Sequence, residues 1–281
     1  MHNAAFAALG LDWRYLAFEV EPQNLGAAIA GAKAMQFAGL NLTVPHKLLA
    51  VDLVDVLEAS AKIWGAVNTI KFERSAGGSP ANFSGHAGGT PAPPEIRAVG
   101  YNTDADALVT AVGEDLQLEL RGARMLLLGA GGAGCAAALR LAAENVAELF
   151  LVNRTRSKAE ALAAEIKRRF PPVRAAVGYP PAAVDLVLNA TSLGLRPGDP
   201  SPLDEKQFSL KRTRAVYDLI YNPAETALLQ AARANGCQTA NGLGMLLHQG
   251  AKAFEIWTGK PAPLDVMRRA LEQTIYGHDR K

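Results

Sequence analysis

The chain has 281 residues, of which 49% are hydrophobic and 20% charged, and its formal net charge is +2 at pH 7. This composition excludes a disordered protein, and the near-neutral charge without a long basic run argues against a nucleic-acid-binding protein. The longest apolar runs are broken by glycine and carry arginine, so we expect no membrane span. Only two cysteines occur, Cys135 and Cys237, and no secretory signal opens the chain, which favours a cytoplasmic protein.

The first hundred residues alternate between β-rich runs and helical patterns. The alternation predicts strands at residues 15–20, 39–44, 66–72 and 98–103, with helices at 21–35 and 46–57. Residues 74–97 are rich in Gly, Pro, Ala and Ser, and such a composition buries too little apolar surface to offset its ordering entropy. We expect this insertion to be an exposed hairpin extension without chemistry.

A second series of strands begins at Met125. The apolar runs predict strands at 125–130, 148–153, 173–178, 185–190, 215–220 and 237–241, and helical stretches separate most of them. Two further helices are expected at 242–259 and 264–276. Near-continuous apolar strands alternating with helices are typical of an α/β protein with a doubly wound parallel sheet.

A glycine-rich loop, GAGGAG, follows the first strand of this second series and opens a helix. The G-x-G-x-x-G spacing at this place predicts a dinucleotide site, because the glycines allow a tight turn and bring backbone N–H groups close to a pyrophosphate. A glycine-rich turn without a ligand is the alternative, which the strand–turn–helix context disfavours. The expected cofactor-binding residues here are Gly129, Ala130, Gly131, Gly132 and Ala133.

The next strand ends in a basic segment. An NAD site usually carries an acidic residue at this position, whereas here Asn153 is followed by Arg154, Thr155 and Lys158. A carboxylate would repel a 2′-phosphate, and a guanidinium can bind one with paired charge-assisted hydrogen bonds. The alternative is a solvated basic helix start, which the helix dipole disfavours unless an anion binds. The sequence therefore favours NADP.

Eight segments, in this order, resemble the shikimate dehydrogenase family: GLNLTVPHK, GAVNTI, GYNTD, GAGGAG, NRT, NATSLG, YNP and GLGMLLHQ. The resemblance implies an N-terminal α/β substrate domain over residues 1–104, joined by helices of 242–281, and a Rossmann NADP-binding domain over 105–241. It also implies reversible, NADP-dependent reduction of 3-dehydroshikimate to shikimate, in the biosynthesis of chorismate and the aromatic amino acids.

The resemblance assigns catalysis to Lys47 and Asp104, facing each other across the substrate, with Lys47 as the principal acid–base group. Hydride delivery to a ketone builds negative charge on oxygen, which a nearby ammonium group stabilises before it donates the proton. Pro45 is expected to stop the preceding strand and to help fix the position of Lys47. From the residues alone, Lys47 also fits a solvated helix start, and Asp104 also fits a cap of the helix that follows it.

Further contacts are implied by the same resemblance. Neutral donors suited to a hydroxylated ring are Thr43, Asn68 and Gln249, and Tyr221 matches a position near the substrate, although an interfacial tyrosine is an equal alternative. Thr191, Ser192, Gly242 and Met245 match positions on the cofactor side, whereas Asn189 is expected to serve the turn that follows its strand. No metal site is expected.

One departure from the family pattern concerns the N-terminus. The family carries a first strand and a Ser-x-Ser segment ahead of His-Asn, and this chain begins at Met1-His2-Asn3, so we expect weaker anchoring of a substrate carboxylate. The alternatives are a dehydrogenase of quinate or another hydroxylated ring acid, and an NADP-binding relative without turnover. The expected partner is a small-molecule substrate, without nucleic acid or membrane, in a monomer or homodimer.

Overall fold

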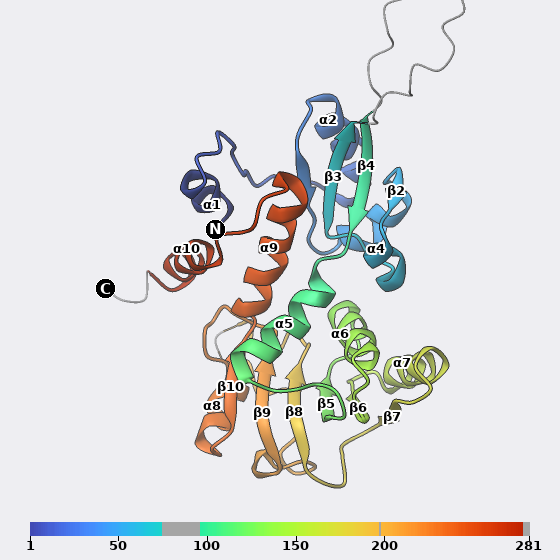
Figure 1. The fold of residues 1–281 in the computed structure, drawn as a ribbon. Coiled ribbons are helices and arrows are strands. Elements are labelled where there is room, and N and C mark those ends of the chain that lie inside the picture. The colour runs from blue at the N-terminus through green and yellow to red at the C-terminus, as the bar shows by residue number, and fades with distance from the viewer. Residues whose placement is uncertain (75–95, 197, 278–281) are drawn as a thin grey trace, which may run out of the picture. The chain divides into compact units, whose positions relative to one another are not determined.

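The computed structural model describes residues 1–74, 96–196 and 198–277, which divide into two compact units (Figure 1). The first unit comprises Met1–Asp12, Asp104–Ala251 and the C-terminal residues from Pro263. The second comprises Trp13–Thr103 and Lys252–Ala262. Most of the insertion expected to be a hairpin extension, residues 75–95, lies outside the described residues. The division by function, with residues 1–104 and 242–281 on one side and 105–241 on the other, stays a prediction.

A six-stranded parallel sheet forms the centre of the first unit, in the order β10-β9-β8-β5-β6-β7. Its strands are β5 (Arg124–Leu128), β6 (Glu148–Val152), β7 (Arg174–Val177), β8 (Val184–Asn189), β9 (Thr213–Asp218) and β10 (Gln238–Asn241). All five pairings between neighbours are parallel, which confirms the predicted doubly wound sheet. The strand order reverses between β5 and β8, the place where such sheets bind ligands at the carboxyl ends of their strands.

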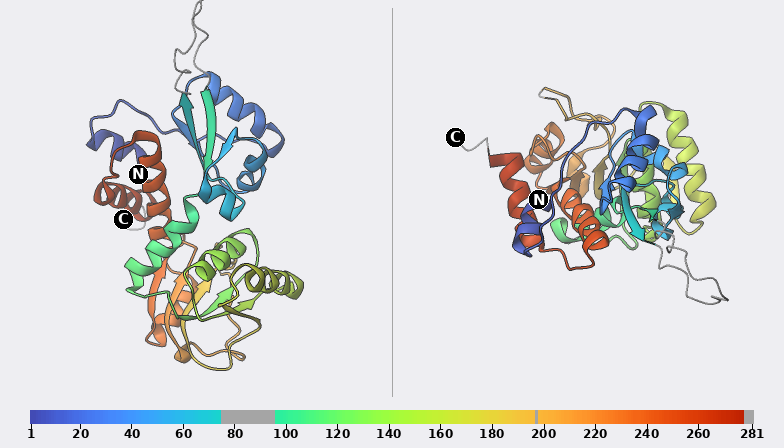
Figure 2. Two further views of the ribbon diagram at one scale, coloured as in Figure 1. Left: turned by 45° about the vertical axis from the view of Figure 1, so that its right-hand side comes forward. Right: turned by 90° about the horizontal axis from the view of Figure 1, so that it is seen from above.

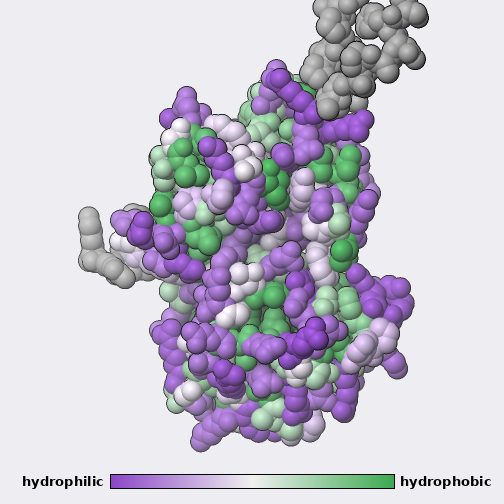
Figure 3. Space-filling model, in the orientation of Figure 1, coloured by the Kyte–Doolittle hydropathy of each residue, from purple (hydrophilic) through white to green (hydrophobic). Residues whose placement is uncertain are grey.

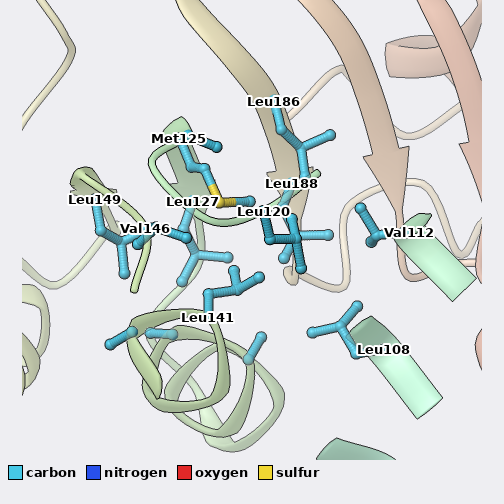
Figure 4. Packing of buried hydrophobic residues seen from close by; sticks show 14 of the residues in the cluster. Leu108, Val112, Leu120, Met125, Leu127, Leu141, Val146, Leu149, Leu186 and Leu188 are labelled. Atoms are coloured by element: carbon cyan, nitrogen blue, oxygen red, sulfur yellow. The ribbon is translucent and has the colours of Figure 1, made fainter. Parts of the chain in front are cut away.

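Alternate residues of each strand point to opposite faces of the sheet, and a layer of packed segments covers each face. Met125 and Leu127 pack with one layer of helices, α5 (Asp104–Leu116), α6 (Gly132–Ala143) and α7 (Arg156–Arg169). Figure 4 shows both residues with α5 and α6. Leu126 and Leu128 pack on the other side with α8 (Ala227–Ala234) and with the segment that contains the 3₁₀ turn η3 (Leu210–Arg212). This double burial explains why the central strands β5, β6 and β8 are mostly apolar.

The second unit holds a mixed four-stranded sheet in the order β1-β3-β4-β2. Its strands are β1 (Gly39–Asn41), β2 (Val56–Leu57), β3 (Thr69–Arg74) and β4 (Ile96–Tyr101), of which only β2 and β4 run parallel. Its helices are α2 (Leu25–Ala34), α3 (His46–Leu49) and α4 (Ala59–Trp64), with 3₁₀ turns η1 (Pro22–Asn24) and η2 (Ala50–Asp52). Leu25, Ile29 and Ala61 of the helices share one core with Ile70 and Ala98 of the sheet.

The strand predicted at residues 15–20 is wrong, because this segment is irregular in the structure. Its apolar side chains do not form a buried face, since Leu16 and Phe18 are 66% and 64% exposed. Side-chain contacts take the place of a strand ladder: the Tyr15 hydroxyl donates a hydrogen bond to Oδ1 of Asn41 at 3.1 Å, and the rings of Tyr15 and Trp257 lie 6.1 Å apart.

The helix predicted at residues 46–57 is only partly correct. Helical structure ends at Asp52, and residues 56–57 form the edge strand β2. Asp55 explains the change, because its backbone N–H donates to the Ala98 carbonyl at 2.9 Å while its carboxylate accepts from the Ala98 N–H at 2.6 Å. The Lys33 ammonium lies 2.8 Å from the same carboxylate. These bonds align the chain beside β4 and favour a strand over a further helical turn.

Three more helices complete the chain: α1 (His2–Ala8), α9 (Leu243–Thr258) and α10 (Leu264–Tyr276). Within the first unit α1 and α10 lie side by side, as both views of Figure 2 show. Helix α9 begins in the first unit, and its last residues belong to the second, where the Trp257 indole donates to the Ile70 carbonyl at 2.9 Å. Within the described ranges no helix combines the length and the hydrophobicity that a membrane crossing requires. Hydrophilic and hydrophobic residues are intermixed on the face that Figure 3 shows.

Candidate active site

The glycine loop between β5 and α6 is built so closely that two of its positions exclude a side chain. Gly129 has a φ of +105°, and a Cβ there would lie 2.9 Å from the Ala190 carbonyl oxygen. A Cβ on Gly134 would lie 2.1 Å from the carbonyl oxygen of Gly129, which is backbone and cannot rotate away. The turn and the close helix–strand packing predicted from the motif are therefore confirmed.

The middle of the same loop is open. Apart from the adjacent residues and the backbone of the same helix, no described atom lies within 4 Å of a Cβ built on Gly131 or Gly132, and both glycines are exposed. Helix α6 begins at Gly132, so the N–H groups of its first turn have no carbonyl partner within the helix. These N–H groups and the positive end of the helix dipole suit a phosphate group. The loop thus fits the pyrophosphate of a dinucleotide.

Asn153 connects the glycine loop to the basic segment after β6. Its Oδ1 accepts a hydrogen bond from the Ala130 N–H at 2.9 Å, and its Nδ2 donates to the Thr155 carbonyl at 2.8 Å. Arg156 is paired with Glu160 at 2.8 Å, whereas Arg154 is exposed and forms no ion pair within the described residues. Arg154 is therefore the guanidinium that can receive a 2′-phosphate at this edge.

Two hollows flank the loop within the first unit. A groove of about 450 Å³ runs between the loop and the first turns of α7, and its lining includes Gly131, Cys135 and Lys158. A cavity of about 260 Å³ lies at the carboxyl ends of β8 and β9, and its lining includes Ala133, Thr191, Ile220 and Tyr221. Residues of the first turn of α6 line both hollows, Ala133 the cavity and Gly132 the groove, so both adjoin the expected place of the pyrophosphate.

A buried polar network supports the wall of the smaller cavity. Asn189, the last residue of β8, accepts from the Thr191 N–H at 2.9 Å and from its hydroxyl at 2.8 Å, so Asn189 serves the turn as expected. Its Nδ2 donates to Oδ1 of Asp218 at 2.9 Å. Asp218 is 0% exposed, and burial raises the pKa of its carboxyl group although Thr226, Ile220 and Asn189 all donate to it. Asp218 is not among the residues predicted from the sequence.

The turn from β10 into α9 lies at the carboxyl ends of the strands, next to the loop after β9. Gly242 admits no side chain, because a Cβ would lie 2.1 Å from the Leu219 carbonyl oxygen. Oδ1 of Asn241 accepts from the Leu243 N–H at 3.0 Å and so caps the helix. The Tyr276 hydroxyl donates to the Tyr221 carbonyl at 2.8 Å. Asn241 and Tyr276, also missed from the sequence, fix the backbone on which two predicted residues, Tyr221 and Met245, depend.

In the second unit, Lys47 is the second residue of α3 and is half-buried. Strand β1 ends at Asn41, so Pro45 does not stop the strand as predicted; it stands just before α3, after a turn in which the His46 N–H donates to the Thr43 carbonyl at 2.8 Å. The Lys47 carbonyl accepts from the Val67 N–H at 2.9 Å. This bond ties the lysine backbone to the segment that leads into β3.

Asn68 lies beside that bond and is 1% exposed. Its Oδ1 accepts from the Thr103 N–H at 2.8 Å, and its Nδ2 donates to the Thr103 hydroxyl at 2.9 Å. The pair joins the start of β3 to the residue after which α5 begins with Asp104. The sequence did not show that Asn68 has a structural role, although a buried amide must find hydrogen-bond partners.

Comparison with known proteins identifies the family to which the chain belongs. Residues 1–70 match the family model of the shikimate dehydrogenase substrate-binding domain, residues 111–193 match the shikimate/quinate 5-dehydrogenase model, and residues 242–272 match the shikimate 5′-dehydrogenase C-terminal domain. The NADP(+) shikimate dehydrogenase of Methanopyrus kandleri is 37% identical over 278 residues, covering 96% of this chain and 89% of the relative. The chain belongs to the shikimate dehydrogenase family.

Solved structures of similar proteins agree with this family. A crystal structure of a shikimate dehydrogenase in complex with NADP+ has a TM-score of 0.80 and 36% identity, with 98% of this chain and 89% of that chain covered. The ligand-free 5-ketofructose reductase of Gluconobacter sp. strain CHM43 has a TM-score of 0.79 and 33% identity, with 97% and 92% covered. Proteins named for different substrates therefore share this fold.

The residues predicted for a shikimate dehydrogenase site fall into two groups. The cofactor residues lie at the carboxyl ends of the six-stranded sheet: Gly129, Ala130, Gly131, Gly132, Ala133, Asn153, Arg154, Thr155, Lys158, Thr191, Ser192, Gly242 and Met245. Asp104, Tyr221 and Gln249 belong to the same unit, whereas Thr43, Lys47 and Asn68 belong to the other. The described part of the chain contains no cluster of side chains suited to hold a metal.

Proposed function

We propose that this member of the family is an NADP-dependent shikimate dehydrogenase, which interconverts 3-dehydroshikimate and shikimate in aromatic amino acid biosynthesis. The observation that carries the proposal is the combination, in one chain of this family, of an open glycine loop with Arg154, which forms no ion pair within the described residues. Arg154 directly follows Asn153, which stands where NAD enzymes carry an acidic residue. The two unpaired thiols, Cys135 and Cys237, support a cytoplasmic location.

The chain holds the cofactor through residues of the first unit. The N–H groups around Gly131 to Ala133 bind the pyrophosphate, and Arg154, Thr155 and Lys158 bind the 2′-phosphate. The nicotinamide end is contacted by Thr191, Ser192, Gly242 and Met245. It lies beside the cavity that Thr191 and Ile220 line. Bound NADPH supplies the hydride that reduces the substrate ketone.

The acid–base step belongs to Lys47. Its ammonium group stabilises the negative charge that develops on the carbonyl oxygen and then donates a proton to it. In the oxidation of shikimate the neutral amine accepts that proton. Asp104 orients the substrate hydroxyl. Thr43, Asn68, Tyr221 and Gln249 complete the ring contacts, and the amide nitrogen of Asn68 carries a second hydrogen besides the one it gives to Thr103.

A second candidate is the oxidation of quinate, because the family model matched by residues 111–193 is described for both shikimate and quinate. Lys47 and Asp104 would serve either substrate equally well. The test is a steady-state comparison of shikimate and quinate, each with NADP and with NAD. Our proposal predicts the highest kcat/KM for shikimate with NADP. A preference for quinate would support the second candidate, and NADPH binding without turnover of either acid would indicate a non-catalytic relative.

A further inference from the structure

Asp218 is a buried carboxylate for which the proposed chemistry has no use. It is the last residue of β9, is 0% exposed, and accepts three hydrogen bonds. The Thr226 hydroxyl donates to Oδ2 at 2.7 Å, while the Ile220 N–H and Nδ2 of Asn189 donate to Oδ1 at 3.1 Å and 2.9 Å. Burying a carboxylate is costly unless such donors surround it, so a leucine of similar size would be the simpler core residue.

The three donors reach both loops that line the smaller cavity. The bond from the Ile220 N–H fixes the loop after β9, and Ile220 and Tyr221 line the cavity. The bond from Asn189 fixes the amide that binds the N–H and hydroxyl of Thr191 after β8. Thr191 lines the opposite side of the same cavity. One carboxylate therefore fixes the positions of two separate loops relative to each other.

We propose that Asp218 is a positioning residue for the nicotinamide end of the cofactor, acting through Asn189 and Ile220 on the walls of this cavity. The proposal rests on the cofactor site of the proposed function. Hydride transfer requires the reacting atoms to be held within a fraction of an ångström, and supporting hydrogen bonds provide that order. The proposed place of the adenosine end is the groove beside Lys158, whose lining includes no residue of these two loops, so its binding should not depend on them.

The binding of two ligands is measured to distinguish this role from a general effect on folding. NADP contacts the whole site, whereas adenosine 2′,5′-bisphosphate lacks the nicotinamide end. We compare Asp218→Leu, which removes all three acceptor contacts, with Asp218→Asn. The asparagine keeps the two contacts at Oδ1 and replaces the third with a hydrogen bond from its Nδ2 to the Thr226 hydroxyl. Asp218→Leu should raise the dissociation constant of NADP about tenfold and leave that of adenosine 2′,5′-bisphosphate within about twofold. Asp218→Asn should stay within about threefold of the unmodified chain for both ligands.

A smaller change covers the case in which Asp218→Leu does not fold. Thr226→Val removes one donor to Asp218 and keeps the shape of the side chain, and Thr226→Ser keeps the hydroxyl as the matched control. Thr226→Val should weaken NADP about threefold, again without an effect on adenosine 2′,5′-bisphosphate. Unchanged NADP binding in the folded variants, or equal losses for both ligands, would overturn the proposal.

The titrations need no turnover, so they are independent of the substrate. If the unmodified chain binds NADP but oxidises no shikimate, the proposed function fails while the binding pattern of the variants still decides the role of Asp218. In an active enzyme the same variants should lower kcat more than they raise the KM for shikimate. A change in that KM alone would contradict a role at the nicotinamide end.

Discussion

Lys47 is the residue on which the proposed chemistry depends most. It stands in α3, where the Val67 N–H holds its backbone carbonyl, so the side chain starts from a fixed point. In the proposed mechanism Lys47 supplies the proton to the substrate oxygen, whereas Asp104 and the ring contacts are assigned only to orientation of the substrate, which does not replace that proton.

Replacement of Lys47 by Ala should lower kcat by about 10²–10⁴-fold, the usual span for a positioned acid–base group. The KM for shikimate should change much less, because neutral donors make most of the ring contacts. Steady-state kinetics measure both constants. Lys62→Ala, in the last turn of α4, is the matched control and should behave like the unmodified chain. Near-normal turnover of Lys47→Ala would show that the lysine is an ordinary solvated residue.

We expect Arg154 to determine the preference for NADPH over NADH. Arg154→Ala removes charge-assisted bonds to the 2′-phosphate, each worth about 1.5–3 kcal/mol, so NADPH binding should weaken roughly ten- to a hundredfold. NADH lacks that phosphate and should bind almost as before. Fluorescence titrations with the two cofactors test this, with Arg168→Ala at the far end of α7 as the control. Equal losses for both cofactors would count against a phosphate-binding role.

At the scale of elements, the start of α6 allows a direct comparison of two helical glycines. Gly134→Ala places a Cβ 2.1 Å from the Gly129 carbonyl oxygen, so the loop and helix must separate, at a cost of about 1–3 kcal/mol. Gly113→Ala in α5 meets no described atom within 4 Å and should stabilise the protein by about 0.5–1 kcal/mol. Urea unfolding measures both changes. A neutral Gly134→Ala would contradict the close packing of the loop.

Helix α1 carries a buried histidine whose titration should make stability depend on pH. His2 is 4% exposed and stacks on Phe6, and burial, together with the neighbouring N-terminal ammonium, lowers its pKa from 6.5 to about 4. As pH falls below 6.5, the unfolded chain binds a proton that the folded chain does not accept, so stability decreases until about pH 4.

The free energy of unfolding should therefore fall by about 2 kcal/mol more in the unmodified chain than in His2→Gln between about pH 7 and about pH 5. Urea unfolding of both proteins at the two pH values gives the difference. Identical pH dependence in the two proteins would show that His2 titrates normally in the folded state.

Apolar runs and periodic patterns predicted most strands and helices, whereas some short elements that depend on single hydrogen bonds were not predicted. The six parallel strands and α10 follow the prediction closely, because long apolar runs between turn residues leave few alternatives. Helix α4 and strand β2 escaped prediction, since Asp55 and Glu58 direct them through specific bonds: Glu58 caps α4 by accepting from the Ser60 N–H at 2.8 Å. Such bonds depend on the partner's position in space, which a single sequence does not show.

Across the whole molecule, motifs predicted residues for ligand contacts but not the residues that support them. Asp218 looks like any polar residue at a strand end, and only the structure shows its three donors. An acidic residue inside the apolar run AVYDLI was the available signal. The compact units also differ from a simple split of the chain, because α9 begins in one unit and ends in the other.

The proposed activity is tested most directly by the reduction of 3-dehydroshikimate with the purified chain. The reaction is followed as NADPH consumption together with chromatographic detection of the product. An NADP-dependent shikimate dehydrogenase should form one shikimate for each NADPH consumed, and NADH should support a far lower rate. NADPH consumption without shikimate, or no consumption by a chain that binds NADPH normally, would contradict the central claim.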